Sequence, residues 1–418
     1  METQTYIENL ARAARTASVP LRTLSSSCKN AALEAMSVAL TERSAEIFAA
    51  NARDVENATQ KGISGALLDR MTLSDKKIAA MADGCRQVAA LSDPINRVLS
   101  GETRPNGLKI EKISVPLGVV AVIYESRPNV TVDAAILALK AGNAVILRGG
   151  SEAIETNQIL AHIIRDAATQ NGFPAGAIGF VETTDRAAGA ILAQLPQFID
   201  LIVPRGGEGL KKALSKVATV PIIFAAGGVC HVYVDEFAEV EMAQNIAFNA
   251  KTQGPSACNA AETLLVHRAI ASEFLPSFAQ KMLDFGVELR GDENSRQIVP
   301  QIGAANDSDW DEEYLALILA VKIVDSLDVA ISHISLHGTA HSEAIVTQNV
   351  RRAEEFLARV DAAAVYVNAS TRFTDGFEFG LGAEVGISTQ KLHSRGPMGL
   401  EALTSTKYVV RGDGQLRG

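Results

Sequence analysis

The residues best suited to covalent chemistry in this sequence are its four cysteines: Cys28, Cys85, Cys230 and Cys258. Cys258 follows a Gly254-Pro255 pair and precedes an expected strand at 263–266, so it should lie on a loop. A thiolate is a good nucleophile and needs only a modest fall in pKa to react. A loop between two α/β domains would suit that role. The alternative is a buried, inert cysteine, the commoner fate of an unpaired thiol.

The sequence has no zinc-type cysteine pair such as C-x2-C, because none of the four cysteines lies within four residues of another. We therefore expect no metal. Cys230 is next to His231, but both fall on an expected buried strand, where adjacent side chains point to opposite faces. Few and scattered cysteines suit a reducing compartment, so the sequence predicts a cytoplasmic protein.

Two glycine-rich strings follow expected strands: Arg-Gly-Gly-Ser-Glu at 148–152 and Pro-Arg-Gly-Gly-Glu-Gly at 204–209. Glycines there let the backbone approach a ligand, and the next helix N-terminus offers N–H groups to a phosphate. Either string alone could simply turn the chain. Two of them on strand–helix units, each with an arginine, favour a nucleotide site. Neither has the Lys-Ser/Thr ending of a P-loop, so ATP hydrolysis is not supported.

Two further segments carry polar groups suited to a substrate. Asn129 follows the first strong strand, where a parallel sheet presents functional residues, and its amide could donate to a developing oxyanion. An Asx turn or a cap is the plainer interpretation. Residues 367–397 are polar and rich in glycine, and their Ser, Thr, Asn and Arg groups suit a small carboxylate. A flexible surface excursion is the alternative there.

The elements that must position these groups are expected to be helices first and then strands alternating with helices. Residues 1 to about 100 have helical spacing, as a lead-in to a larger fold or as a freestanding helical domain. Helical segments such as 152–170 and 184–194 then separate β-branched runs, with a second domain starting near 245. The runs lie at 119–124, 144–147, 178–181, 201–203, 231–234, 263–266, 321–324, 344–346, 363–367 and 407–410. The alternation predicts an α/β fold with parallel sheets covered on both faces.

Length and charge narrow the class of protein. At about 150 residues per domain, 418 residues predict two or three domains. The net charge of 39 − 48 = −9 and the pI of about 5.4 argue against a nucleic-acid or anionic-membrane partner, because both need basic patches. The acidic N-terminus lacks a signal-peptide core, and no apolar run approaches the length of about 18 residues expected of a membrane span.

Several strings together resemble the aldehyde dehydrogenase superfamily and, within it, the γ-glutamyl phosphate reductase (glutamate-5-semialdehyde dehydrogenase) family. They are Pro-Leu-Gly-Val-Val-Ala-Val-Ile-Tyr-Glu at 116–125 with Asn129 after it, Gly-Asn-Ala-Val-Ile-Leu-Arg at 142–148, Ala-Ile-Ser-His-Ile at 330–334, His-Gly-Thr-Ala-His-Ser-Glu at 337–343 and Asn-Ala-Ser-Thr-Arg-Phe-Thr-Asp-Gly at 368–376. The resemblance covers essentially the whole chain. It implies an aldehyde dehydrogenase-like fold: two doubly wound parallel α/β domains plus a small β oligomerisation element.

The resemblance also implies a division of labour. Residues 1–102 and 120–244 would form a dinucleotide-binding domain, and residues 245–394 a catalytic domain, with the active site in the cleft between them. Residues 103–119 and 395–418 would form the oligomerisation element of a homodimer or homotetramer.

By position, Cys258 matches the family's nucleophile, and Asn129 matches the oxyanion-hole amide that works with the Cys258 backbone N–H. The expected cofactor is NADPH, with Arg148 suited to its extra phosphate and Glu313 to its nicotinamide ribose. The expected cofactor-binding set is Arg148, Ser151, Glu152, Gly206, Gly207 and Glu313. The expected substrate-binding set is Asn368, Ser370, Thr371 and Arg372.

The implied reaction is the NADPH-dependent reduction of γ-glutamyl 5-phosphate to glutamate 5-semialdehyde, with release of phosphate, through a thioester on Cys258. It is the second step of proline biosynthesis from glutamate. The implied partner is a small-molecule substrate, with transient contact with glutamate 5-kinase as an open possibility.

Two positions depart from the wider pattern. Hydrolytic aldehyde dehydrogenases carry a Glu-x-Gly-Gly string whose Glu activates water, and the matching residues 225–228 here are Ala-Ala-Gly-Gly, which suits an acyl phosphate partner. Gly254 stands where the reductases tend to carry Arg or Tyr, which leaves the shape and charge of this loop open. Two alternatives follow: a non-catalytic protein that kept the fold, and a thioester-forming aldehyde dehydrogenase that uses coenzyme A. The match of residues 368–372 to the glutamyl enzyme argues against the second.

Overall fold

The computed structural model describes residues 2–125 and 127–417 and divides into two compact units. The first comprises Met1–Ala225, Gly380–Gly386 and Met398–Gly418, and the second comprises Ala226–Phe379 and Ile387–Pro397. This division falls earlier than the boundary near residue 245 suggested by the sequence. The reason is that the strand Cys230–Val234 pairs with strands of the second unit on both sides.

The first unit opens with helices, as the helical spacing predicts. They are α1 (Glu2–Leu21), α2 (Ser26–Glu42), α3 (Ser44–Gln60), α4 (Ala66–Met71) and α5 (Asp75–Ala90). Ser25 begins α2 as an N-cap, because its Oγ accepts the Cys28 N–H at 3.3 Å. Buried residues of these helices, such as Ile7 and Leu33, share one apolar core with Val119 and Ile146 of the following sheet. The helices are therefore part of the α/β unit and not a freestanding domain.

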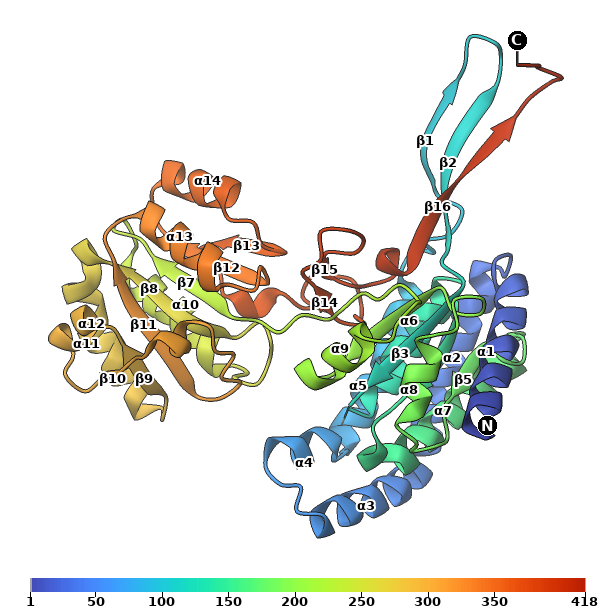
Figure 1. Ribbon diagram of the computed structural model, residues 1–418, viewed down its shortest axis with the longest axis horizontal. Coiled ribbons are helices and arrows are strands. Elements are labelled where there is room, and N and C mark those ends of the chain that lie inside the picture. The colour runs from blue at the N-terminus through green and yellow to red at the C-terminus, as the bar shows by residue number, and fades with distance from the viewer. Residues whose placement is uncertain (1, 126, 418) are drawn as a thin grey trace. The chain divides into compact units, whose positions relative to one another are not determined.

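The core of the first unit is a four-stranded parallel sheet in the order β5-β4-β3-β6, of which Figure 1 labels β3 and β5. All six residues of β3 are buried, as expected for a strand covered on both faces. The strands are β3 (Val119–Tyr124), β4 (Ala144–Arg148), β5 (Ile178–Phe180) and β6 (Leu201–Arg205). The helices are α6 (Asn129–Lys140), η1 (Ser151–Ala153), α7 (Ile154–Gln170), α8 (Ala187–Leu192) and α9 (Glu208–Ser215). Since β4 and β6 flank β3 on opposite sides, the carboxyl ends of these strands form a topological switch point, the usual place for a ligand.

A second, antiparallel sheet of the first unit extends away from the α/β sheet, in the order β1-β2-β16 (Figure 1). Its strands are β1 (Val98–Thr103), β2 (Lys109–Pro116) and β16 (Thr404–Arg411), with η4 (Glu401–Leu403) just before β16. Every residue of β1 is exposed, and Val98 and Tyr408 are 58% and 68% exposed. The sequence predicts the strand at 407–410 but not β1, which begins at the end of the stretch of about 100 residues expected to be helical.

The second unit contains a seven-stranded sheet in the order β10-β9-β11-β8-β7-β12-β13, in which neighbouring strands pair in parallel. The strands are β7 (Cys230–Val234), β8 (Ala261–His267), β9 (Glu288–Gly291), β10 (Gly303–Ala304), β11 (Ile318–Val324), β12 (Ser342–Val346) and β13 (Ala364–Val367). The helices are α10 (Val240–Thr252), α11 (Arg268–Asp284), α12 (Glu293–Ile298), η2 (Asp307–Trp310), α13 (Leu327–His337), α14 (Val350–Arg359) and η3 (Thr371–Phe373). A short antiparallel pair, β14 (Ile387–Ser388) and β15 (Gly396–Pro397), completes this unit.

Alternation along the strands of the second unit builds two separate cores. Val232 and Val234 belong to the core that contains Phe274 and Phe278 of α11. Tyr233, between them, belongs to the other core, which contains Phe356 of α14. Successive strand residues point to opposite faces, so both faces of the sheet are covered by helices. The α/β fold with parallel sheets predicted from the sequence is therefore confirmed.

Candidate active site

The candidate nucleophile lies on residues 253–260, which join α10 to β8 and are called the nucleophile loop below. Cys258 is half-buried, and its carbonyl oxygen accepts the Cys230 S–H at 3.2 Å. A Cβ on Gly228 would overlap that same carbonyl oxygen, so only glycine fits there. The Gly-Gly string at 227–228 thus packs directly against the backbone of the cysteine. The loop lies within the second unit, before the first residue of β8.

A buried ion pair joins the two ends of the nucleophile loop. Lys251, in the last turn of α10, lies 2.5 Å from Glu262, the second residue of β8, and both side chains are almost fully buried. Burial raises the pKa of Glu262 to about 7 and lowers the pKa of Lys251. Glu262 also accepts the Leu315 N–H at 3.3 Å. Breaking a buried pair leaves one uncompensated charge, so this pair holds the loop ends together.

Glu313 contacts the other side of the Gly-Gly string. Its Oε1 accepts the Gly228 N–H at 2.7 Å, and a Cβ on Gly227 would lie 2.6 Å from its Oε2. The carboxylate expected at the nicotinamide ribose is therefore hydrogen-bonded to the residue that packs on Cys258. No carboxylate occurs at residues 225–228 themselves, as the sequence shows.

Residues 337–343, one of the strings that carry the family resemblance, contact the backbone at residues 229–231, directly after the Gly-Gly string. Thr339 Oγ1 accepts the Val229 N–H at 3.0 Å, and Glu343 accepts from the backbone and ring nitrogens of His231 at 2.9 Å. His341 lies 3.8 Å from the Cys230 sulfur. The strand register shifts between Cys230 and His231 in the pairing with β8, so the simple alternation expected from the sequence stays a prediction for these two residues. Burial raises the pKa of Cys230 well above its usual value, so this second thiol is unsuited to be the nucleophile.

The four residues expected to bind substrate have different environments. The side-chain amide of Asn368 forms two hydrogen bonds with the backbone of Thr347. Its oxygen accepts the Thr347 N–H, and its nitrogen donates to the Thr347 carbonyl oxygen, both at 2.9 Å. Ser370 and Thr371 are buried, and Thr371 donates to the Asn259 carbonyl at 2.6 Å. Arg372 is half-buried and donates from Nε to Gln253 at 2.8 Å. The first three residues thus shape the loop, and Arg372 is the one that brings a charge to it.

Asn129 lies in the first unit, as the exposed first residue of α6. Its Nδ2 donates to Asp133 one turn later at 2.8 Å. An amide nitrogen has two hydrogens, so one N–H remains for an acceptor such as a substrate oxygen. Burial raises the pKa of Asp133 to about 6, although the bond from Asn129 and the charge of Arg205 act in the opposite direction.

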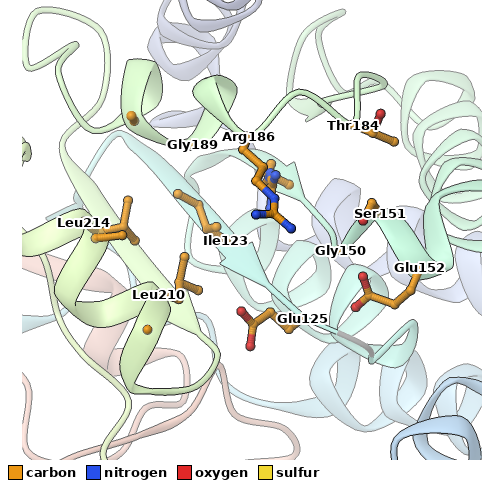
Figure 2. Close-up of a pocket in the computed structure, with 14 residues that line it drawn as sticks. Ile123, Glu125, Gly150, Ser151, Glu152, Thr184, Arg186, Gly189, Leu210 and Leu214 are labelled. Atoms are coloured by element: carbon orange, nitrogen blue, oxygen red, sulfur yellow. The ribbon is translucent and has the colours of Figure 1, made fainter. Parts of the chain in front are cut away.

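A cavity of about 370 Å³ lies at the carboxyl ends of β3 and β4. Three predicted cofactor residues, Arg148, Ser151 and Glu152, line it. Figure 2 shows Arg186 reaching into it from the segment after β5, with Glu125 and Glu152 also around it. Gly206 and Gly207 lie outside the lining, where the Gly207 N–H donates to Glu125 at 3.1 Å. This strand–helix unit instead lines the cavity with residues of its helix α9: Gly209, Leu210, Ala213 and Leu214.

The cavity fits an anionic nucleotide. The buried Nε of Arg148 has no hydrogen-bond partner among the described residues, and burial lowers the pKa of this guanidinium. A buried N–H without a partner is costly, so an acceptor supplied by a ligand would satisfy it. Side chains at Gly149 and Gly150 would collide with Asn157 and Glu152, so glycine keeps the turn tight. The residues present therefore suit a phosphorylated dinucleotide.

Sequence reasoning missed Glu125, Thr184 and Arg186 in this lining. The available signal was the polar run 182–186 that follows the strand Ile178–Phe180. It is the third strand end of the same parallel sheet, and carboxyl ends of neighbouring parallel strands lie together. Asp185 caps α8 by accepting the Ala187 N–H at 2.9 Å, which fixes Arg186 beside the cavity.

Other kinds of site find no support in the described part of the chain. Among residues 2–125 and 127–417, no group of three or more His, Cys, Asp or Glu side chains is arranged to hold a metal ion. In the same residues, no helix is both long and apolar enough to cross a membrane.

Comparison with known proteins places the chain in a family. The sequence model of the aldehyde dehydrogenase family matches residues 1–309. The chain therefore belongs to the aldehyde dehydrogenase family, an oxidoreductase family.

The relatives within that family are more specific. The chain is 57% identical over 411 residues to a γ-glutamyl phosphate reductase of Moorella thermoacetica, covering 98% of each chain. It is 54% identical to one of Halothermothrix orenii, covering 100% of both. The crystal structure of γ-glutamyl phosphate reductase from Thermotoga maritima is similar with a TM-score of 0.95 at 46% identity, over 99% of this chain and 100% of that one. The resemblance to this group stated from the sequence is confirmed.

Proposed function

We propose that the protein reduces γ-glutamyl 5-phosphate to glutamate 5-semialdehyde with NADPH, releasing phosphate, as the second step of proline biosynthesis from glutamate. The observation that carries the proposal is full-length similarity to γ-glutamyl phosphate reductases together with Cys258 on a tightly supported loop. Relatives of this name act on an acyl phosphate, which needs a nucleophile to release phosphate and hold the acyl group.

In the proposed reaction the Cys258 thiolate attacks the carbonyl carbon of the acyl phosphate. Asn129 donates its amide N–H to the oxyanion that forms, and the Asp133 carboxylate holds that amide in orientation. The oxyanion then collapses, the carbon–oxygen bond to phosphate breaks, and a thioester remains on Cys258. Residues 225–228 provide no carboxylate to activate water, so the thioester persists long enough to be reduced.

NADPH supplies the hydride that reduces the acyl group. We propose that Arg148, Ser151, Glu152 and Arg186 hold its adenosine part, with the two arginines on its extra phosphate. Two guanidinium groups at one cavity favour a dianionic phosphate over a neutral hydroxyl, which is the basis for choosing NADPH over NADH. We assign the nicotinamide ribose to Glu313.

The remaining expectations also stand as proposals. The loop from Asn368 to Arg372 would anchor the amino-acid end of the substrate. The exposed sheet β1-β2-β16, with apolar side chains such as Val98 and Tyr408 on its surface, would join copies of the chain into a homodimer or homotetramer. Thiol cysteines fit a cytoplasmic protein, in which glutamate 5-kinase could hand over the acyl phosphate.

The test is phosphate-dependent reduction of NADP by glutamate 5-semialdehyde, the reverse reaction, with wild type, Cys258→Ala and Cys28→Ser. Activity in wild type and Cys28→Ser, with none in Cys258→Ala, is expected. Activity that requires coenzyme A in place of phosphate would support the thioester-forming alternative. Equal rates in wild type and Cys258→Ala, or no rate with any acceptor, would exclude the proposal.

A further inference from the structure

The loop that carries Arg372 is fastened to the nucleophile loop on both sides of Cys258. On one side, Arg372 Nε donates to Gln253 Oε1 at 2.8 Å. On the other, the Asn259 amide donates to the carbonyl oxygens of Arg372 at 3.3 Å and Thr374 at 2.9 Å. The hydroxyl of Thr371 donates to the Asn259 carbonyl at 2.6 Å. The two loops therefore form one structure, and the Arg372 guanidinium has a fixed place on it.

The Arg372 guanidinium lies against Gly254. A Cβ at this position would lie 2.8 Å from Arg372 Nη2 and 3.2 Å from Cζ. Real Cβ atoms essentially never approach other heavy atoms as closely as 2.8 Å, so the flexible Arg372 side chain would have to move to make room for any side chain at residue 254. A side chain at residue 254 would therefore displace the Arg372 guanidinium from the place that it has in this chain.

The Arg372 guanidinium also interacts electrostatically with Cys258. Burial lowers the pKa of Arg372, and the charges of Cys258 and Asp375 act in the opposite direction. Guanidinium groups stay protonated in proteins. A half-buried cation has lost part of its hydration and therefore favours an anion beside it.

The other ionisable groups around this thiol are mostly acidic or neutral. They are Asp375 beside Arg372, Cys230 on β7, Glu313 across Gly228, and Lys251, Glu262, His341 and Glu343 around Cys230. Lys251 is already paired with Glu262 at 2.5 Å. Burial lowers the pKa of His341 to about 4, so it is neutral near pH 7. Arg372 is therefore the cation of this group that is available to the sulfur.

We propose that the Arg372 guanidinium, held over Gly254 by Gln253, stabilises the Cys258 thiolate and so activates the nucleophile. The thiol proton passes to solvent water, and the cation balances the charge left on sulfur. Gln253 and Gly254 are positioning residues, since they act through Arg372. The inference deepens the proposed function and rests on it only for the role of Cys258.

The test is the pH dependence of Cys258 alkylation by iodoacetamide, followed by mass spectrometry of the Cys258 peptide, in the intact protein without substrate. Arg372→Gln is expected to raise the apparent pKa of the Cys258 thiol by about one unit or more and to slow alkylation at pH 7 about tenfold. Arg372→Lys, which keeps the charge, should recover part of the rate. Arg359→Gln, which removes an exposed cation of the same unit, should change neither value.

The positioning residues give an independent measurement. Gly254→Ala must displace the guanidinium, and Gln253→Ala removes its hydrogen bond, so each should raise the same pKa by less than Arg372→Gln does. If Arg372→Gln does not fold, these two variants test whether Arg372 stabilises the Cys258 thiolate. An unchanged pH profile in all variants that fold would overturn the inference. Wild-type protein with this pH behaviour but no reductase activity would instead overturn the proposed function.

Discussion

The candidate site of the first unit lies at the carboxyl ends of its parallel strands, whereas that of the second unit lies at the amino ends of its strands. The nucleotide cavity of the first unit is built from residues that follow β3, β4 and β5, at the carboxyl ends of parallel strands. The cysteine site of the second unit is built from residues that precede β7, β8 and β12, at their amino ends, together with the loop that follows β13 and carries Arg372. The first follows the general rule for open α/β sheets. The second depends on particular contacts between loops, and the predictions below exploit this difference.

The largest effect is expected from Gly228→Ala. The new methyl group would overlap the Cys258 carbonyl oxygen, so the backbone must move, at a cost of about 1–3 kcal/mol in the free energy of unfolding. We expect reductase activity to be lost and Cys258 alkylation to change. Gly84→Ala is the matched control. Gly84 lies in α5, and the new Cβ would make an ordinary 3.9 Å contact with the Ile136 side chain. Thermal unfolding and activity of both variants are the measurements, and an active Gly228→Ala would contradict the account.

Asn129→Ala should lower kcat by about 10²–10³, the usual effect of losing one oxyanion donor. The nucleotide cavity is built from other residues, so the KM for NADPH should stay the same. Steady-state kinetics at saturating NADPH measure both quantities. A changed KM for NADPH with an unchanged kcat would show that Asn129 acts in cofactor binding and not on the oxyanion.

Arg148→Gln and Arg186→Gln should each raise the KM for NADPH about tenfold or more, because hydrogen bonds to charged groups contribute about 1.5–3 kcal/mol. Neither variant should change the KM for NADH, which lacks the extra phosphate. The same assay with both cofactors gives the comparison. Equal losses with NADPH and NADH would show that the arginines do not recognise that phosphate.

Asp133→Asn should have the smallest effect, and one that depends on pH. The folded protein holds the Asp133 proton more tightly than the unfolded chain, since the pKa is raised to about 6. The stability that protonated Asp133 contributes is therefore lost as the pH rises from about 3.8 to about 6, and Asp133→Asn should stabilise the protein at pH 8 but not at pH 4. Protonation below about pH 6 also removes the negative charge that the Asn129 amide donates to and so weakens that hydrogen bond, so kcat should fall there in wild type. Thermal unfolding across pH 4–8 tests the first statement, and kcat across pH 5–8 tests the second.

The sequence predicts buried elements better than exposed ones. The apolar run of β3 identifies a parallel strand directly, because a strand buried on both faces has no polar positions. In β1, by contrast, Val98–Thr103 is exposed throughout and exists through pairing with β2, which local pattern does not reveal. The division at Ala225 is also invisible locally, since Cys230–Val234 reads like any buried strand until its partners are known.

The same contrast applies to the candidate sites. Cys258, Arg148 and Glu313 were accessible from sequence strings and resemblance. Arg186 was not, because a polar run after a strand looks like any surface turn. The role of Gly254 depends on Arg372, a residue far along the chain, so only the folded structure shows which group a side chain there would displace.

The most direct test of the central claim is to trap the acyl group on the protein. Wild-type protein would be mixed with γ-glutamyl phosphate generated by a glutamate kinase, without NADPH, and its peptides analysed by mass spectrometry. The account predicts a glutamyl adduct on the Cys258 peptide that disappears when NADPH is added and is absent in Cys258→Ala. An adduct on another residue, or reduction that proceeds in Cys258→Ala, would contradict it.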